Sequence, residues 1–221
     1  MKFSDYMLLY RLCRERKSLG RALHLLFLRS RALSLSGSGI DFGAKNASAS
    51  YYRFIKLDNR LMSYTDLHGD GVNVVQLDFE KDFDFGQKFD FALVMNTLEH
   101  VYNHATFTQS ICASLVPGGR LEGFVPFLHY YHADPDDYFR YTHSCLKRIL
   151  SEAGFDDIEI TPICVGGLSV SAAILSRILK FPALIYCCWV LALFGDAILS
   201  KLWRYNTNIY WGLAFSGSKI R

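Results

Sequence analysis

Strand-like and helix-like segments alternate through the middle of this chain, and the alternation restricts the fold more than any other feature. The clearest strand is Phe89–Met95, with the sequence FDFALVM, and helical patterns follow at 106–115 and 144–153. The first helical pattern stops at Pro117-Gly118-Gly119 and the second at Gly154. Strands separated by helices pair in parallel, with helices on both faces of the sheet. The sequence therefore predicts an α/β fold with a mostly parallel sheet.

Polar side chains stand at the ends of several predicted strands. The remaining strand-like runs end at Asp41 or span 62–67, 72–79, 120–125, 157–161 and 209–216, and a further helix is expected over 48–55. In such sheets ligands bind beyond the carboxyl ends of the strands, where the strand order reverses. The residues expected along that edge are Asp41, Asp66, Asp78 and Asn96.

Length and cysteine usage favour a single domain in a reducing compartment. At 221 residues the chain can bury a sizeable core without disulfides, and its six cysteines form no C-x-x-C pair. We expect a cytoplasmic protein in three parts. These are a basic helical cap over 1–35, the α/β core over 36–165, and an apolar helical insertion with a final strand over 166–221, which completes the same domain.

The N-terminal segment is basic and amphipathic. Residues 1–31 carry eight Lys or Arg and two Asp or Glu, a charge of +6, whereas the remainder carries sixteen and nineteen, a charge of −3. Leucines at helical spacing over 6–28 predict one or two helices, broken near Ser18 to Gly20. A secretory signal is not expected, since the apolar run contains His24 and is followed by arginines. The basic face suits solvent or an anionic membrane surface.

The segment 166–203 is the most apolar part of the chain. Its uninterrupted apolar run, 181–194, is shorter than the roughly 20 residues that a spanning helix needs, and we expect Gly195-Asp196 to break it. A buried or interfacial helical pair is favoured over a membrane span. The sheet, a homodimer partner or the headgroup layer of a membrane could cover such helices.

The segment 124–142, FVPFLHYYHADPDDYFRYT, concentrates side chains that bind ligands or move protons. It holds two His, four Tyr, three Asp and one Arg behind a short apolar run. A packed core would not favour that mixture. The segment directly follows the strand expected at 120–125, so we expect it to lie at the ligand edge of the sheet.

Several motifs resemble those of one family. They are Ile40-Asp41-Phe42-Gly43, Phe89 to Val94, Leu98-Glu99-His100-Val101, Pro117-Gly118-Gly119 and the run His132 to Thr142. Together they resemble the class I S-adenosylmethionine-dependent methyltransferases, and within them the small type 11-like enzymes of glycan and cell-envelope assembly. The resemblance covers roughly 38–165 and implies a Rossmann-like core that binds S-adenosyl-L-methionine.

The resemblance implies a set of cofactor contacts. Asp41 and Gly43 would hold the methionine end of the cofactor, because its ammonium needs an oxygen acceptor and the backbone must approach closely. Asp66 would accept from the ribose hydroxyls, with Asp58 as the competing candidate, and Asp78 would accept from the adenine amino group. Asn96, Leu98 and Glu99 would line the pocket. The family has glycines where Lys45 and Ala47 stand here.

The acceptor side is assigned to the segment 124–142. His132 is the expected general base, because its unperturbed pKa of about 6.5 suits neutral operation. Asp137 would orient His132, and Arg140 would hold an anionic group of the acceptor. The expected substrate-binding residues are His129, Tyr138 and Tyr141.

Each assignment has a structural alternative. Asp41 and Asp78 could cap the following helices, and Arg140 could be only an ion-pair partner of Asp137 in a turn. His100 and His104 are expected to pack or cap. A metal site at His129, His132 and Asp134 is disfavoured, and we expect no metal.

The sequence thus predicts a methyltransferase that acts on a hydroxyl of a saccharide or glycan-linked acceptor. A catalytically silent scaffold of a glycan-assembly system and a peripheral membrane module are the alternatives. The enzyme is expected in the cytoplasm, at the inner surface of the membrane if the apolar helices bind lipid. Nucleic-acid binding is not expected, because basic and aromatic residues are not interleaved on any one element.

Overall fold

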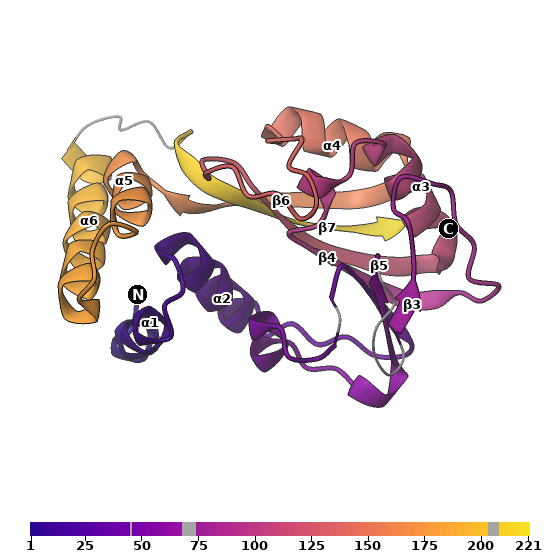
Figure 1. Cartoon of the computed structure of the whole chain (residues 1–221), viewed down its shortest axis with the longest axis horizontal. Coiled ribbons are helices and arrows are strands. Elements are labelled where there is room, and N and C mark those ends of the chain that lie inside the picture. The colour runs from indigo at the N-terminus through magenta and orange to yellow at the C-terminus, as the bar shows by residue number, and fades with distance from the viewer. Residues whose placement is uncertain (45, 68–73, 203–207) are drawn as a thin grey trace. The chain divides into compact units, whose positions relative to one another are not determined.

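The computed structural model of the chain describes residues 1–44, 46–67, 74–202 and 208–221 (Figure 1). The strands are β1 Gly39–Phe42, β2 Met62–Asp66, β3 Val74–Gln76, β4 Phe89–Met95, β5 Leu115–Pro126, β6 Phe155–Val165 and β7 Tyr210–Lys219. The α-helices are α1 Phe3–Arg14, α2 Leu19–Arg31, α3 His104–Ser114, α4 His143–Glu152, α5 Gly167–Leu175 and α6 Pro182–Leu202. Three short 3-10 helices are η1 Ser50–Phe54, η2 Asn59–Leu61 and η3 Leu98–His100.

The chain divides into two compact units. An α/β unit comprises residues 33–161 and 213–221, and a helical unit comprises residues 1–32 and 162–212. The helical unit therefore combines the N-terminal segment with residues 162–212, whereas residues 213–221 belong to the α/β unit.

The α/β unit is built on a seven-stranded mixed sheet with the strand order β3-β2-β1-β4-β5-β7-β6. β1 pairs in parallel with β2 on one side and β4 on the other, so the order reverses between β1 and β4. Figure 1 shows α3 and α4 side by side along this sheet. The predicted Rossmann-like fold, mostly parallel with helices on both faces, is confirmed.

The central strand β4 has the bounds that the sequence predicts. Its side chains are buried except that of Asp90, which accepts hydrogen bonds from the backbone and hydroxyl of Ser38 at 2.7 and 3.1 Å. Beside it an aromatic cluster surrounds the ring of Phe42. Its other members are Phe79, Phe83, Phe85 and Phe107. These ring contacts contribute to the packing of the sheet beside the site.

Two local predictions are corrected in the α/β unit. The Pro117-Gly118-Gly119 motif does not precede the strand but lies inside β5, where Gly118 has φ +77° and the pairing of β4 with β5 shifts register between Phe89 and Phe91. The helix expected over 48–55 is only the 3-10 turn η1. The side chain of Asn46 accepts a hydrogen bond from Ser48 N, which holds the residues just before η1 in a turn. A longer helix therefore does not form there.

In the helical unit the predicted break between the first two helices is confirmed. Ser18 caps α2 by accepting from Arg21 N at 3.2 Å, and Gly20 leaves room for the indole of Trp211. A Cβ at Gly20 would lie 2.0 Å from that ring, so only glycine permits the contact.

The predicted break of the apolar segment at Gly195-Asp196 is wrong. α6 runs unbroken from Pro182 to Leu202, and Asp196 is buried against the start of α5. Its carboxylate accepts from Leu168 N, from Ser169 N and from the Ser169 hydroxyl at 3.1, 2.7 and 2.5 Å. Asp196 therefore acts as the N-terminal cap of a different helix, which the local sequence does not reveal.

Candidate functional site

The candidate site lies where β1, β4 and β5 end side by side in the α/β unit. Phe42 pairs with Val94, Met95 pairs with Phe124, and Asn96 N donates to Phe124 O at 2.9 Å. This is the edge at which the strand order reverses, and a sheet of this kind leaves a crevice there.

The carboxylate of Asp41 is buried beneath the turn after β1. Its Oδ2 accepts from the hydroxyls of Tyr51 and Tyr52 at 2.8 and 2.5 Å. Burial and the nearby Asp41 charge raise the pKa of Tyr52, so its phenol stays protonated as a donor. The sequence did not indicate either tyrosine, because both reach Asp41 only through the 3-10 turn η1.

Gly43 is needed for a contact within the chain. It has φ +94°, and a Cβ there would lie 2.6 Å from Thr97 Oγ1. The Thr97 hydroxyl in turn donates to Phe42 O at 2.7 Å. The turns after β1 and β4 are thereby joined directly. Lys45, which stands where the family has a glycine, lies outside the described residues.

The other acids predicted for the cofactor lie further along the edge. Asp66 ends β2 and is partly exposed. Asp78 begins a turn, accepting from Glu80 N at 3.1 Å and pairing with Lys81 Nζ at 2.8 Å. The hydrogen bond from Lys81, followed by that from Glu80, lowers the pKa of Asp78. Asp78 thus has the local capping contacts of the alternative interpretation.

The turn after β4 places Glu99 in the interior. Asn96 adopts a left-handed backbone with φ 62°, and η3 then directs Leu98 and Glu99 inward, where both are buried. Neither carboxylate oxygen of Glu99 has a hydrogen-bond partner among the described residues. Burial raises the pKa of Glu99 to about 8, against the opposing effects of its own backbone N–H and of the Asn96 side chain.

The segment after β5 is fastened over η3. Tyr138 N and Phe139 N donate to Glu99 O at 2.9 and 3.2 Å, and the Tyr141 hydroxyl donates to Leu98 O at 3.2 Å. His100 Nδ1 lies 2.5 Å from Asp136 O. The LEHV motif and the segment 127–142 therefore form one hydrogen-bonded structure.

Three predicted residues meet within that structure. Asp137 Oδ2 accepts from His132 N at 2.8 Å and lies 3.3 Å from His132 Nδ1. The Arg140 guanidinium donates to both oxygens of Asp137 at 2.5 and 2.6 Å. Burial raises the pKa of Asp137, but the hydrogen bonds from Arg140 and His132 outweigh burial and leave the pKa at about 2.

The donors of Arg140 are largely used within its own segment. Besides Asp137 they reach Phe139 O at 2.7 Å and Tyr130 O at 3.2 Å. A guanidinium engaged in this way fixes the loop, which is the structural alternative for Arg140.

His132 has a defined orientation. Its Nδ1 faces Tyr130 O and Asp137 Oδ2, both at 3.3 Å, whereas its Nε2 lies 3.8 Å from Glu99 Oε1. Both neighbours of Nδ1 are acceptors, so the proton belongs on Nδ1 and the lone pair on Nε2. Burial lowers the pKa of His132 against the opposing charge of Asp137, which favours the neutral ring.

The predicted substrate residues differ in environment. The rings of His129 and His132 are 4.6 Å apart, and the side chain of His129 is partly exposed. Tyr138 is exposed and donates to Asp136 Oδ2 at 2.9 Å, whereas Tyr141 is buried. Tyr138 can contact an acceptor from solvent, and Tyr141 supports η3 from below.

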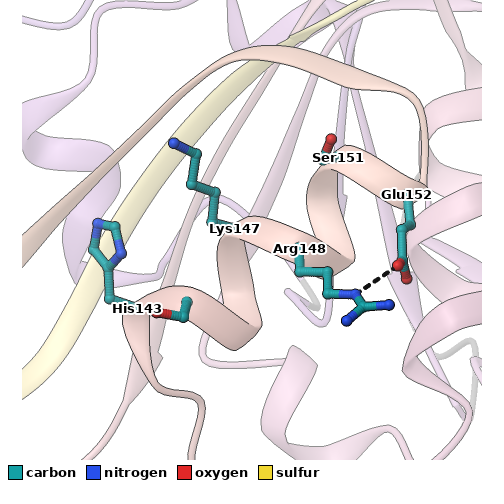
Figure 2. Close-up of a pocket in the computed structure, with 6 residues that line it drawn as sticks. His143, Lys147, Arg148, Ser151 and Glu152 are labelled. Atoms are coloured by element: carbon teal, nitrogen blue, oxygen red, sulfur yellow. Dashed lines mark hydrogen bonds and ion pairs between the residues drawn. The ribbon is translucent and has the colours of Figure 1, made fainter.

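A surface depression elsewhere in the α/β unit contains none of these residues. It is lined entirely from α4, and an ion pair of 2.7 Å between Arg148 Nε and Glu152 Oε1 crosses it (Figure 2). Figure 2 shows its basic and hydroxyl side chains projecting from one helix face rather than converging. The strand-end edge remains the candidate site.

The α/β unit defines a class of fold, that of the class I S-adenosylmethionine-dependent methyltransferases. No protein-family model and no curated protein matches the sequence. Many solved structures do share the fold, at low sequence identity. A S-adenosylmethionine-dependent methyltransferase from Mesorhizobium loti has a TM-score of 0.55 and 14% identity, over 90% of this chain and 98% of that one.

Two further solved structures share the fold but are enzymes of different kinds. Phosphoethanolamine N-methyltransferase 2 of Haemonchus contortus, in complex with S-adenosylhomocysteine, has a TM-score of 0.53 and 14% identity over 90% of this chain. This chain spans only 52% of that protein's length. The [4+2]-cyclase SpnF has a TM-score of 0.54 and 16% identity, over 90% of this chain and 81% of that one. At such identities the similarity establishes the fold alone.

Proposed function

We propose that this protein is a S-adenosylmethionine-dependent methyltransferase that methylates a hydroxyl of a saccharide or glycan-linked acceptor. The observation that carries the proposal is the juxtaposition of His132 and Glu99 at the strand-end crevice of a methyltransferase fold. The similar Haemonchus enzyme is complexed with S-adenosylhomocysteine, the product of this cofactor. In this proposal Asp41, Gly43, Asp66, Asp78, Asn96, Leu98 and Glu99 remain the cofactor-side residues.

A sugar hydroxyl is supported by what surrounds His132. The aromatic rings of Tyr130, Tyr131 and Tyr138 are 51%, 71% and 45% exposed on the same segment. Exposed aromatic rings with polar tips suit the C–H faces and hydroxyls of a saccharide. Their exposure is the reason for placing a glycan rather than a small apolar acceptor here.

The chemistry is an in-line displacement. A bond forms between the acceptor oxygen and the methyl carbon while the bond from the sulfonium sulfur to that carbon breaks, which leaves S-adenosylhomocysteine. The hydroxyl proton passes to Nε2 of His132, and Asp137 stabilises the resulting imidazolium through Nδ1. The rest of the protein positions the reactants and excludes water.

The decisive test is calorimetric titration of the full chain with S-adenosylmethionine. We expect saturable heat and a thermal shift. No heat and no shift at millimolar cofactor would refute the proposal and favour a silent scaffold. Replacing Lys45 and Ala47 by glycine sharpens the result, because a gain in affinity would show that the turn limits binding.

The helix α6 supports a second proposal, attachment to the inner surface of a membrane from the cytoplasm. One described helix, α6, is long and apolar enough to cross a bilayer, with a mean hydropathy of 1.9 in its best window and 11% of that window buried. Leu191 and Phe194 are 69% and 63% exposed. An apolar face of this size favours a lipid or protein surface over water.

Flotation with anionic liposomes tests the attachment. The wild type should float, and Leu191→Glu with Phe194→Glu should remain in the dense fraction. Ser200→Glu, an exposed polar position on the same helix, is the matched control. The Arg14, Arg16, Lys17 triple-alanine variant separates the basic contribution from the apolar one. A wild type that does not float but elutes as a dimer would assign the face to a second copy.

A further inference from the structure

Glu99, His100 and His132 bring three electron-pair donors together at the candidate site. Nε2 of each histidine lies 3.8 Å from Oε1 of Glu99. One ligand atom from each residue lies within 4.8 Å of the others. The metal set considered from the sequence was different, because the short turn η3 brings His100 beside the segment after β5.

The histidines are both held so that Nε2 faces the carboxylate. Nδ1 of His100 lies 2.5 Å from the carbonyl oxygen of Asp136, and Nδ1 of His132 faces Tyr130 O and Asp137 Oδ2. Acceptors at both Nδ1 atoms place the protons there and leave two Nε2 lone pairs directed inward. Metal-binding histidines are oriented in this way, by a carbonyl or carboxylate at the other ring nitrogen.

The third group, Glu99, is fully buried, and its oxygens lack hydrogen-bond partners among the described residues. A separation of 3.8 Å is too long for a hydrogen bond from either histidine. A buried carboxyl group without hydrogen-bond partners is costly, and a cation in place of its proton would complete the arrangement.

The spacing fits an ion. A triangle with two sides of 3.8 Å and a third no longer than 4.8 Å has a centre about 2.5 Å from its corners. Zinc lies about 2.0–2.2 Å from nitrogen and oxygen ligands, so side-chain shifts of a few tenths of an ångström would close the site.

We propose that Glu99, His100 and His132 bind a divalent transition-metal ion of the zinc class through Oε1 and the two Nε2 atoms. Two imidazoles among three ligands favour this class over magnesium or calcium. Three protein ligands leave a coordination position open, and the side chain of His132 is 26% exposed.

For the proposed methyl transfer, on which this one consequence rests, the ion would take over the work of the base. Nε2 of His132 cannot both bind a metal and accept a proton, since it has one lone pair. The acceptor hydroxyl would instead occupy the open position, lose its proton to water, and attack the methyl group as an alkoxide. The expectation of a site without metal is thereby replaced by a testable alternative.

The test is a titration of the chelator-stripped full chain with ZnCl2 and, in parallel, CoCl2, without the methyl cofactor. We expect one ion per chain and a visible cobalt absorption that Zn²⁺ displaces. Omitting the cofactor keeps the outcome separate from that of the methyltransferase proposal. A wild type that takes up no stoichiometric Zn²⁺ or Co²⁺ overturns the inference.

Variants locate the ion. Glu99→Gln, His100→Ala and His132→Ala should each weaken Zn²⁺ binding on the order of a hundredfold or more, and Asp137→Asn, which acts through His132, about tenfold. His143→Ala removes a histidine of α4 outside the cluster and should change nothing. Circular dichroism verifies folding, and Glu99→Gln should fold readily because glutamine has nearly the same size and shape and brings no charge into the interior. Stoichiometric binding that survives all three substitutions would place the ion elsewhere and overturn the inference.

Discussion

Two buried carboxylates stand at neighbouring strand ends, and the chain treats them differently. Asp41, near the end of β1, receives hydrogen bonds from two tyrosine hydroxyls, whereas Glu99, after β4, faces two histidines beyond hydrogen-bond distance. Both are fully buried. The chain itself therefore stabilises the first carboxylate, and the second retains an unmet requirement for a cation or a proton.

The difference links Asp41 to the stability of the crevice and Glu99 to its chemistry. A carboxylate that already has strong donors contributes to folding and is replaced only at a cost. An unsatisfied one costs stability and is retained where a ligand completes it. The Glu99 side of the crevice is accordingly where we place the reacting groups.

The largest expected effect is on turnover. Replacing His132 by Ala should lower kcat on the order of a hundredfold while S-adenosylmethionine affinity, measured by calorimetry, stays unchanged. Equal loss of turnover and cofactor affinity would mean that His132 only supports the fold. Treating the wild type with chelator separates the two proposed mechanisms, because a histidine base works without metal and the metal site does not.

The next effect is on stability at the Asp41 side. Asp41→Asn should reduce the free energy of unfolding by about 2 kcal/mol, because two hydrogen bonds to a charged acceptor are weakened in the interior. Urea denaturation measures it. Asp156→Asn, an exposed acid of β6, should stay within about 0.5 kcal/mol. Equal responses of the two variants would contradict the contrast drawn here.

Replacing Glu99 should not lower the free energy of unfolding as replacing Asp41 does. Glu99→Gln should leave the metal-free protein as stable as the wild type at pH 7, because a carboxyl group with a pKa of about 8 is already neutral there, and should stabilise it by up to about 1 kcal/mol above pH 8, where Glu99 is charged. Glu122→Gln is the matched control, since that buried glutamate pairs with Arg120 at 2.7 Å and its loss should destabilise. Destabilisation of both variants in denaturant titrations would show that Glu99 has a partner.

The sequence was sufficient for the fold because local patterns determine it. β4 could be bounded from FDFALVM, since its apolar run ends at a polar turn, and the break between α1 and α2 is marked by Ser18. Asp196 could not be interpreted locally. It caps a helix that begins 29 residues earlier, and no spacing rule reports such a contact.

Several residues of the candidate site could be predicted from the sequence, but most of the contacts between them could not. The expected neighbours Asp137 and His132 do lie together, because the loop that carries both is short. The donors to Asp41 and the grouping of Glu99 with His100 depend on two 3-10 turns. Such turns have little sequence signal, so contacts made through them emerge only in three dimensions.

The last expected effect, a dependence of stability on pH, tests whether acid sensitivity arises outside the two carboxylates. His24 of α2 is fully buried, and burial, aided by the Arg21 charge, holds its pKa well below 6.5. The unfolded chain then binds a proton that the folded one does not. Stability should fall by about 1 kcal/mol per pH unit as pH drops below about 6.5 towards the folded pKa. Thermal melts of His24→Gln from pH 7.5 to 5 should lack that slope, and an identical slope in wild type and variant would show that His24 is not its source.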